Sequence, residues 1–324
     1  MISTPAQRII FMGTAEFAVP SLVALLSAGH EVVAVVTQPD KPQGRKQILV
    51  PSPVKQCAEA HGLTVLQPRR VRSEKFQEKM FALAPDVLAV AAFGQIVPQT
   101  LLDLPRIAPI NVHGSLLPKY RGAAPIQRAL MEGEAVTGVT TIWMDATLDT
   151  GDILLMESLS ILPTDTSETL TNRLAEVGAN LLVKTLEGLI EGTLSRTPQD
   201  DSLSNYAAML ELTDGIVRWE ESARLISARV RGVNPKPGAF TEINGRRVKV
   251  WMALETETAC RESTPGTVLA ISKNPAGVLV VGGDGYAVLL TEVQPEGGKR
   301  MAASDWARGL RLVAGDRFTQ PHLP

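Results

Sequence analysis

Short, almost continuous apolar runs alternate with amphipathic segments through the first half of the chain, and this alternation constrains the fold more than any other feature. Four runs have the length of buried strands, at residues 8–12, 31–36, 86–92 and 106–112. Between the first two, apolar side chains recur at helical spacing from Phe17 to Leu26, and Gly29 ends the segment. Strands that lack polar alternation are typical of a parallel sheet covered on both faces by helices. We therefore expect an α/β domain with a doubly wound, mostly parallel, Rossmann-like sheet.

The pattern changes in the second half of the chain. A helical period runs from Asp165 to Gly192, and a polar stretch without a clear period follows it. Further on, two pairs of short apolar runs flank turn sequences, 240–243 and 246–251 around Asn244-Gly245, and 277–281 and 286–290 around 282–285. A length of 324 residues exceeds the usual size of one core. We predict a first domain over 1–192, a linker over 193–212, and a small OB-like β-barrel with a helix near 220–230 over 213–324.

Composition excludes several classes of protein. No apolar run approaches the roughly 20 residues of a membrane-spanning helix. The first residues lack the basic and then apolar stretches of an export signal. Cys57 and Cys260 stand too far apart in the sequence for metal-type spacing and are typical of reduced thiols. The net charge is −2, with a small excess of basic residues after position 208, which permits contact with nucleic acid. We expect a cytoplasmic protein with no membrane contact and no metal.

An amide, an imidazole and a carboxylate form the strongest candidate for chemistry. Asn111 and His113 close the fourth apolar run, and Asp149 lies in Leu-Asp-Thr-Gly-Asp at 148–152. Ligands of doubly wound sheets bind beyond the carboxyl ends of the strands. Transfer of an acyl group to an amine needs a proton acceptor and donors for the developing oxyanion. Asn111 and His113 project to the same side of an extended segment, and Asp149 would hold the imidazole and favour its charged form.

Each of these residues also has a purely structural interpretation. A single histidine at a strand end is often a hydrogen-bonded structural residue, and an asparagine there is often a turn former. Asp149 and its neighbours could form only a turn.

Two segments next to these residues have the character of a ligand-binding rim. The partly apolar loop of Ser115, Leu116, Leu117 and Pro118 suits a flat aromatic ligand. Gly94, Gln95 and Ile96 follow a neighbouring apolar run, and their backbone could bind a heterocycle such as a pterin. The alternative for both is an ordinary turn after a strand. The turn at Gly13-Thr14 lacks the later glycines of a dinucleotide fingerprint, which argues against an NAD enzyme.

The combination Asn-x-His-x-Ser-Leu-Leu-Pro and Leu-Asp-Thr-Gly-Asp resembles the core of the folate-dependent formyltransferases. Further segments are similar to the methionyl-tRNA formyltransferase family within that group, and they extend over nearly the whole chain. They are residues 37–40, 51–55, 121–128, 138–140, 248–251 and 265–268.

This resemblance implies a reaction and its residues. The formyl group of 10-formyltetrahydrofolate would pass to the α-amine of methionine on initiator methionyl-tRNA. Asn111, His113 and Asp149 match the family's catalytic positions, and residues 115–118 match a loop that contacts the folate. We expect Asn111 and His113 to be oxyanion donors and Asp149 to set the protonation of His113.

The resemblance also implies contacts with the acceptor stem through residues 37–53. Four prolines and one glycine predict that this segment lacks regular structure, and Lys41, Arg45 and Lys46 offer positive charge to RNA. Gln47 and Ile48 depart from the family, which usually has lysine or glycine there, so Arg45 is the principal expected contact. Without the resemblance, the segment is a solvated surface loop.

A second basic group flanks the Asn244-Gly245 turn. Alternation along a strand puts Arg247 and Lys249 on one face, where they could bind phosphates. The alternative is a charged face that protects a strand edge.

Three other functions remain open from the sequence. One is a folate-dependent formyltransferase for a different amine, such as a sugar nucleotide. Another is a 10-formyltetrahydrofolate hydrolase, in which water accepts the formyl group. The last is an RNA-binding protein without catalysis. For the transferase we expect a monomer.

Overall fold

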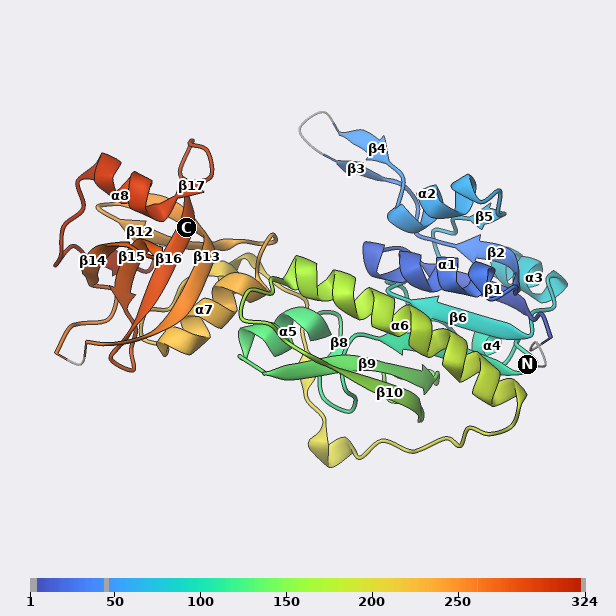
Figure 1. Ribbon diagram of the computed structural model, residues 1–324. Coiled ribbons are helices and arrows are strands. Elements are labelled where there is room, and N and C mark those ends of the chain that lie inside the picture. The colour runs from blue at the N-terminus through green and yellow to red at the C-terminus, as the bar shows by residue number, and fades with distance from the viewer. Residues whose placement is uncertain (1–4, 44–46, 261, 322–324) are drawn as a thin grey trace. The chain divides into compact units, whose positions relative to one another are not determined.

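The computed structural model describes residues 5–43, 47–260 and 262–321 of the chain (Figure 1). These residues fall into two compact units. The first lies within 1–122, 137–159 and 171–207, and the second within 123–136, 160–170 and 208–324.

A seven-stranded sheet forms the centre of the first unit, in the order β10-β9-β7-β6-β1-β2-β5. Its strands are β1 (Arg8–Gly13), β2 (Glu31–Val36), β5 (Val65–Leu66), β6 (Val87–Ala91), β7 (Ala108–His113), β9 (Val136–Trp143) and β10 (Ile153–Ser160). The pairs from β7 through β6, β1 and β2 to β5 are parallel, and β9 joins β7 antiparallel. The expected mostly parallel α/β sheet is therefore confirmed.

Helices cover both faces of this sheet. Ile10, Met12 and Leu88 pack with apolar side chains of α3 (Glu74–Ala82) and α4 (Gln99–Leu102). On the other face, α6 (Ser167–Ile190) approaches through Gly178, where an added Cβ would lie 2.9 Å from Val112. Because side chains alternate along a strand, Asn111 and His113 point away from the face to which Val112 belongs. This unit also contains η1 (Glu16–Ala18), α1 (Val19–Ser27) and α2 (Pro53–Ala60) (Figure 1).

A buried histidine at the start of the sheet makes stability depend on pH. His30 is 7% exposed, and its Nδ1 accepts a hydrogen bond from the Gln7 N–H at 3.3 Å. Burial lowers the pKa of His30 below its ordinary value of 6.5. The unfolded chain therefore binds a proton at a higher pH than the folded protein, so acid favours unfolding.

We expect the midpoint of urea unfolding to fall as the pH drops from 7 to 5.5, and to fall less in His30→Gln. Urea titrations of both proteins at the two pH values test this. His61→Gln, at an exposed site on the surface, is the control. Equal losses in the original protein and in His30→Gln would contradict it.

The second unit contains an antiparallel sheet in the order β14-β15-β16-β13-β12-β18, with β17 paired to β16. Its strands are β12 (Ala239–Ile243), β13 (Arg246–Ala259), β14 (Val268–Lys273), β15 (Ala276–Val281), β16 (Tyr286–Pro295), β17 (Met301–Ala302) and β18 (Phe318–Thr319). Both expected hairpins are confirmed. Asn244 and Gly245 turn the first one with φ of 51° and 69°, as a tight two-residue turn requires.

The core of this unit gathers around large aromatic side chains. The Trp219 and Phe318 rings lie 5.3 Å apart, and both are buried. The unit also contains α5 (Pro125–Met131), η3 (Leu212–Gly215), α7 (Ala223–Gly232) and α8 (Ala303–Leu310). An added Cβ at Gly232 of α7 would lie 2.4 Å from Met131 of α5, so the glycine allows these two helices to pack closely.

Two segments have more regular structure than the sequence pattern predicts. The expectation that residues 37–53 lack regular structure is wrong, because β3 (Lys41–Gln43) and β4 (Ile48–Val50) pair antiparallel. Pro42 fits there because a two-stranded ribbon leaves one edge of each strand without a partner. The polar segment 193–212 contains η2 (Asp201–Leu203) and β11 (Tyr206–Ala207), which pairs with β8 (Arg121–Gly122).

Candidate active site

His113 ends β7 with a buried imidazole whose two nitrogens have different environments. Nε2 lies 2.9 Å from the main-chain oxygen of Tyr120. A carbonyl oxygen only accepts, so Nε2 carries a proton and donates it there. Nδ1 lies 3.6 Å from Oδ2 of Asp149, with the two side chains 6% and 12% exposed. Nδ1 is therefore the ring nitrogen that the main chain leaves available to Asp149 or to a ligand.

Asp149 reaches this position from a strained loop. Its φ is 56°, a left-handed conformation that aspartate adopts more readily than most residues. Oδ2 accepts a hydrogen bond from the Gly122 N–H at 2.8 Å. At Gly151, an added Cβ would lie 1.9 Å from the Trp143 carbonyl oxygen, so only glycine fits. This geometry fixes one carboxylate oxygen between a backbone donor and the imidazole.

Asn111 lies one pleat before His113 on β7, and its side chain is partly exposed. Among the described residues, its amide has no hydrogen-bond partner. A free amide on the same side as His113 can donate to a ligand oxygen. The structure thus brings His113 and Asp149 together and leaves Asn111 available beside them.

The loop after β7 contains buried residues that fix its conformation and partly exposed residues that can contact a ligand. Ser115 is fully buried, and its hydroxyl donates to the Lys119 carbonyl at 2.6 Å. Thr140 donates to the Ser115 carbonyl at 2.7 Å and accepts from the Leu117 N–H at 3.1 Å. Leu117 is also buried, whereas Leu116 and Pro118 are partly exposed. Ser115 and Leu117 therefore hold the loop, and Leu116 and Pro118 can contact a ligand.

The Gly94–Ile96 segment also contains residues that fix its conformation and a residue that stays exposed. Gly94 has φ of 81°, and its carbonyl accepts from Gln38 at 2.9 Å. The Gln95 side chain accepts from the Val71 N–H at 3.3 Å and donates to the Pro68 carbonyl at 3.4 Å. Ile96 is 63% exposed, an unusual exposure for a large apolar side chain. Gln95 thus ties this segment to the next loop, and Ile96 is the apolar surface that remains.

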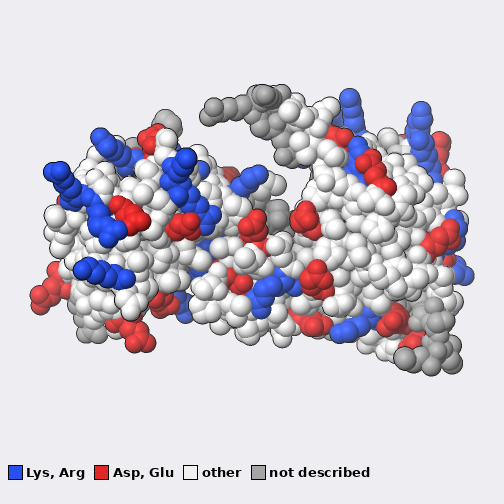
Figure 2. All heavy atoms as spheres, turned by 45° about the horizontal axis from the view of Figure 1, so that its top comes forward, with Lys and Arg blue, Asp and Glu red and all other residues white. Residues whose placement is uncertain are grey.

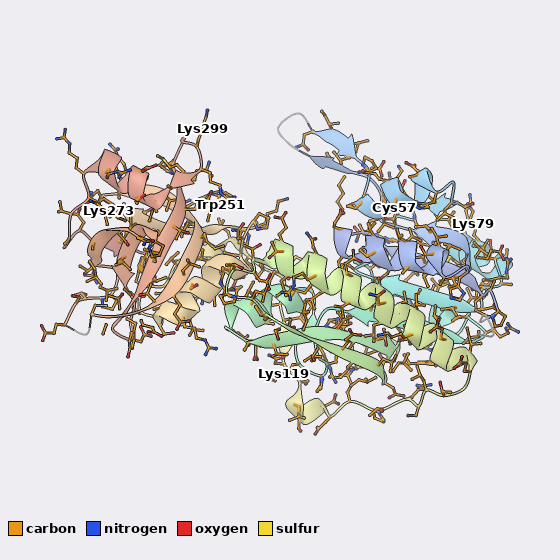
Figure 3. All side chains as sticks on the ribbon, in the orientation of Figure 1. Cys57, Lys79, Lys119, Trp251, Lys273 and Lys299 are labelled. Carbon is orange, nitrogen blue, oxygen red and sulfur yellow. The ribbon has the colours of Figure 1, made fainter. Side chains whose placement is uncertain are left out.

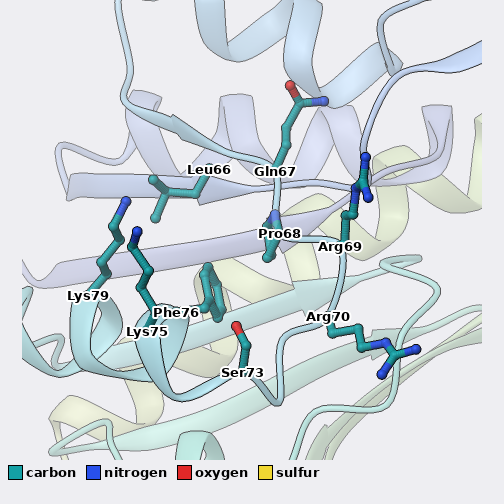
Figure 4. A pocket seen from close by; sticks show the side chains of 9 residues that line it. All are labelled: Leu66, Gln67, Pro68, Arg69, Arg70, Ser73, Lys75, Phe76 and Lys79. Carbon is teal, nitrogen blue, oxygen red and sulfur yellow. The ribbon is translucent and has the colours of Figure 1, made fainter.

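That next loop forms one wall of a basic pocket of about 590 Å³ (Figure 4). Pro68 and Phe76 lie against it, and Lys75 and Lys79 project into it from one side of α3 (Figure 4). Arg69 and Arg70 complete its cations. Within the described part of the chain, no carboxylate lies within ion-pairing distance of these four side chains. The sequence pattern does not indicate this pocket, because Lys75 and Lys79 alternate with Glu74 and Glu78 along the helix and form no charge run.

Sequence reasoning also missed the polar residues that hold the site from residues 199–205. Gln199 donates to the main-chain oxygens of Asp149 and Gly151, each at 2.8 Å. The Asn205 side chain accepts from the Tyr120 N–H, and its main-chain oxygen accepts from Arg121 at 3.0 Å. These contacts span about 50 and 85 positions in the sequence, so no local pattern indicates them.

The expected nucleic-acid contacts lie on both units. Lys41 is exposed on β3, and Arg45 and Lys46 lie outside the described residues. On β13, Arg247 and Lys249 face outward while Val248 and Val250 are buried. The Lys249 ammonium lies 5.9 Å from the centre of the Trp251 ring.

This basic and aromatic surface continues beyond β13. The Arg300 guanidinium lies 4.8 Å from the same Trp251 ring. Figure 3 shows Trp251 and Lys299 on this unit, and Figure 2 shows several Lys and Arg side chains gathered over it. The antiparallel-sheet unit therefore has the Trp251 ring next to two cationic side chains, those of Lys249 and Arg300.

The residues that the structure describes contain neither a candidate metal site nor a candidate membrane-spanning helix. There, no three His, Cys, Asp or Glu side chains come together as a metal site would require. No helix in this part of the chain has the length and apolar character to cross a bilayer. Cys57 and Cys260 are free, and burial raises the pKa of both thiols, so they remain neutral.

Comparisons with known proteins agree over nearly the whole chain. Residues 7–186 match the family described as formyl transferase, and residues 209–311 match the formyl transferase C-terminal domain. A methionyl-tRNA formyltransferase of Lachnospira eligens is 49% identical over 95% of this chain and 98% of its own length. That of Geobacter metallireducens is 47% identical over 96% and 98%.

Solved structures show the same fold at much lower identity. An N-formyltransferase from Helicobacter canadensis, in complex with folinic acid and dTDP-3-aminofucose, has a TM-score of 0.65 at 19% identity. It matches 88% of this chain and 98% of its own. HypX from Aquifex aeolicus, in complex with tetrahydrofolic acid, has a TM-score of 0.62 at 18% identity over 98% of this chain and 51% of its own.

Proposed function

The chain belongs to the methionyl-tRNA formyltransferase family, and we propose that it transfers the formyl group of 10-formyltetrahydrofolate to the α-amine of methionine on initiator methionyl-tRNA. One observation carries this assignment to the site. A free amide and a buried imidazole lie on the same side of β7 at its carboxyl end, and a partly buried carboxylate lies 3.6 Å from the imidazole. These are the groups that acyl transfer to an amine requires.

The folate co-substrate supplies an activated formyl group, and the chain's residues stabilise its transfer. As the amine adds to the formyl carbon, negative charge develops on the formyl oxygen. The Asn111 amide and the Nδ1 side of His113 donate hydrogen bonds to that oxygen. Asp149 stabilises the charged imidazole and receives the amine proton through a water molecule. The bond to the folate nitrogen then breaks, and that nitrogen takes up a proton.

The exposed apolar side chains around the site suit a flat heterocycle. Ile96, Leu116 and Pro118 are the exposed parts of the two predicted folate segments. Gly94, Gln95, Ser115 and Leu117 shape these segments from behind. These internal contacts support folate binding by the two segments. A loop that is already rigid loses little conformational entropy when its exposed side chains bind a ligand.

The acceptor amine distinguishes this function from its nearest alternative. We expect transfer to charged initiator tRNA and no transfer to an amino-sugar nucleotide at matched concentrations. An assay that follows the labelled formyl group into each acceptor tests this. Faster transfer to the sugar nucleotide would assign the site to a different amine.

The basic pocket beside residues 94–96 fits the anionic end of the folate. Folates carry glutamyl carboxylates, and Arg69, Arg70, Lys75 and Lys79 have no carboxylate partner among the described residues. Gln95 joins the pocket loop directly to the segment that we assign to the heterocycle.

Arg69→Ala should therefore raise the KM for 10-formyltetrahydrofolate about fivefold, the effect of roughly 1 kcal/mol, with little change in the KM for tRNA. Steady-state kinetics with each substrate varied in turn measure both constants. Arg72→Ala, an exposed neighbour outside the pocket, is the matched control. An unchanged folate KM would place the carboxylates elsewhere.

We also propose a division of work between the two parts of the chain. Residues 1–192 would form the catalytic domain, 193–212 the linker, and 213–324 a tRNA-binding domain. An OB-like barrel is our proposal for the last of these, and contacts between the two ends of its strand path support it. Thr267 and Arg317 form a bridge, and the Phe318 N–H donates to the Gly266 carbonyl at 2.8 Å. We propose that the enzyme is a cytoplasmic monomer.

The tRNA contacts proposed for Arg247 and Lys249 predict a change in salt dependence. Each neutralised phosphate contributes about one to the slope of log affinity against log salt. Lys249→Ala should weaken tRNA binding and lower this slope by about one, as should Arg247→Ala. Filter binding over a range of salt concentrations gives the slope. Lys273→Ala, an exposed lysine at the end of β14, is the control, and equal slopes in all proteins would contradict the assignment.

The initiator-specific contact is proposed for the 37–53 segment. Lys41 is exposed on β3, and Ile48 and Leu49 are 61% and 65% exposed on β4. Exposed apolar and basic side chains on one protruding ribbon are typical of a partner-binding element. Arg45 and Lys46 extend the same proposal on sequence grounds alone.

A further inference from the structure

A polar segment outside the predicted catalytic positions runs beside the Asp149 loop in a fixed register. Ile153 and Thr197 exchange two backbone hydrogen bonds, at 2.8 and 2.9 Å. Arg196 forms an ion pair with Asp152 at 2.9 Å, and its guanidinium lies 4.3 Å from the Trp143 ring centre. In an antiparallel register, two residues beyond Thr197 lie opposite two residues before Ile153. This register therefore places Gln199 opposite Gly151.

The Gln199 amide uses all of its hydrogen-bonding capacity there. Nε2 donates one hydrogen to the Asp149 carbonyl and one to the Gly151 carbonyl, each at 2.8 Å. Oε1 accepts from Nε and Nη2 of Arg121, at 3.1 and 2.8 Å. An amide has two donors and two acceptor sites. No carboxylate or apolar side chain could make this set of bonds.

These bonds connect the two segments whose contact orients the reactive carboxylate. Arg121 immediately precedes Gly122, whose N–H donates to Oδ2 of Asp149. Asp149 itself has a left-handed φ of 56°, which costs a non-glycine residue about 1 kcal/mol or more. Gln199 therefore holds both the strained loop and the segment that supplies its backbone donor.

We propose that Gln199 is a positioning residue for formyl transfer, which acts by holding the Asp149 carboxylate against His113. This proposal rests on the proposed function, because it concerns the same site. The positioning role extends the proposed function, because it gives a part in the reaction to a segment that the sequence pattern predicts to be a linker. Misplacement of a catalytic group by about 1 Å can cost up to 10²-fold in rate.

Gln199→Met preserves length and removes all four hydrogen bonds. We expect kcat to fall at least 10-fold, with both KM values within twofold of the original. The nearby Ser202→Ala, an exposed change in η2, should leave kcat unchanged. Gln199→Glu separates the two sets of hydrogen bonds that the amide makes. It keeps an acceptor for Arg121 but places negative charge against the two main-chain carbonyls that the amide nitrogen contacts. Its kcat should fall at least as far as that of Gln199→Met.

A double-mutant cycle distinguishes positioning from general structural support. If Gln199 acts through the carboxylate, Gln199→Met should change kcat by less than twofold in an Asp149→Asn background. A loss of equal size in both backgrounds would overturn the proposal, as would a Gln199→Glu enzyme of full activity. If Asp149→Asn is impaired and Gln199→Met is not, only this inference fails. If the unaltered enzyme transfers no formyl group to methionyl-tRNA, the proposed function fails.

Discussion

Asp149→Asn is expected to lower kcat for formyl transfer by about 10²-fold or more while the protein stays folded. The substitution keeps the size of the side chain and an oxygen that can accept from the Gly122 N–H. It removes the negative charge 3.6 Å from Nδ1 of His113, in surroundings where both side chains are nearly excluded from water. Charge is worth most in such surroundings, so the effect should appear in turnover more than in binding.

Single-turnover rates with saturating substrates measure this effect without interference from product release. Asp103→Asn is the matched control, because its carboxylate is exposed and, among the described residues, accepts a side-chain hydrogen bond only from Gln99. Circular dichroism of each variant confirms that the fold is intact. A turnover of Asp149→Asn within threefold of the original would remove the carboxylate from the reaction.

Asn111→Ala should cause the second large loss, about 10²-fold in kcat, because one preorganised oxyanion donor is typically worth 10²- to 10³-fold. The Asn111 side chain makes no hydrogen bond to the other described residues, so its removal should cost little stability. Thermal unfolding should therefore shift by no more than a few degrees. This combination of a large kinetic effect and a small structural effect is the expected sign of a group that binds only the reacting atoms.

The matched control for Asn111 is Asn180→Ala, an exposed asparagine on α6. It should leave kcat unchanged. Comparison of kcat with the two KM values assigns the role. A rise in the folate KM at constant kcat would make Asn111 a ligand-binding residue and leave the oxyanion to His113 alone.

The sequence predicted those parts of the fold that depend on local pattern. Continuous apolar runs identified β1, β2, β6 and β7 because a parallel sheet buries both faces of its strands. The Asn244-Gly245 turn identified the β12–β13 hairpin because both residues need positive φ. The position of Asn111 and His113 at a strand end followed from the same pattern.

The sequence did not predict features that depend on distant contacts. The prolines of residues 37–53 argue against strands, yet β3 pairs with β4, because an isolated two-stranded ribbon has free edges at which proline is accepted. Gln199 and Asn205 resembled ordinary linker residues, because their partners lie far away in the sequence. The basic pocket was hidden for a similar reason, since Arg69 and Lys79 converge only when α3 packs against its loop.

The proposed folate segments contain residues of two kinds. All seven predicted residues lie on the two expected loops, but they do not share one role. The Ser115 and Gln95 side chains form hydrogen bonds within the protein, and the Leu117 side chain is buried. Ile96, Leu116 and Pro118 retain exposed surface. We therefore expect substitutions of the first group to lower stability and substitutions of the second to raise the folate KM.

The most direct test of the account follows labelled 10-formyltetrahydrofolate with three acceptors: charged initiator tRNA, charged elongator methionine tRNA, and water alone. The account predicts rapid appearance of the label in formyl-methionine on the initiator tRNA, much slower transfer to the elongator tRNA, and negligible release of formate without tRNA. Release of formate at the rate of the tRNA reaction would contradict it, because the amide, imidazole and carboxylate would then activate water rather than an amine.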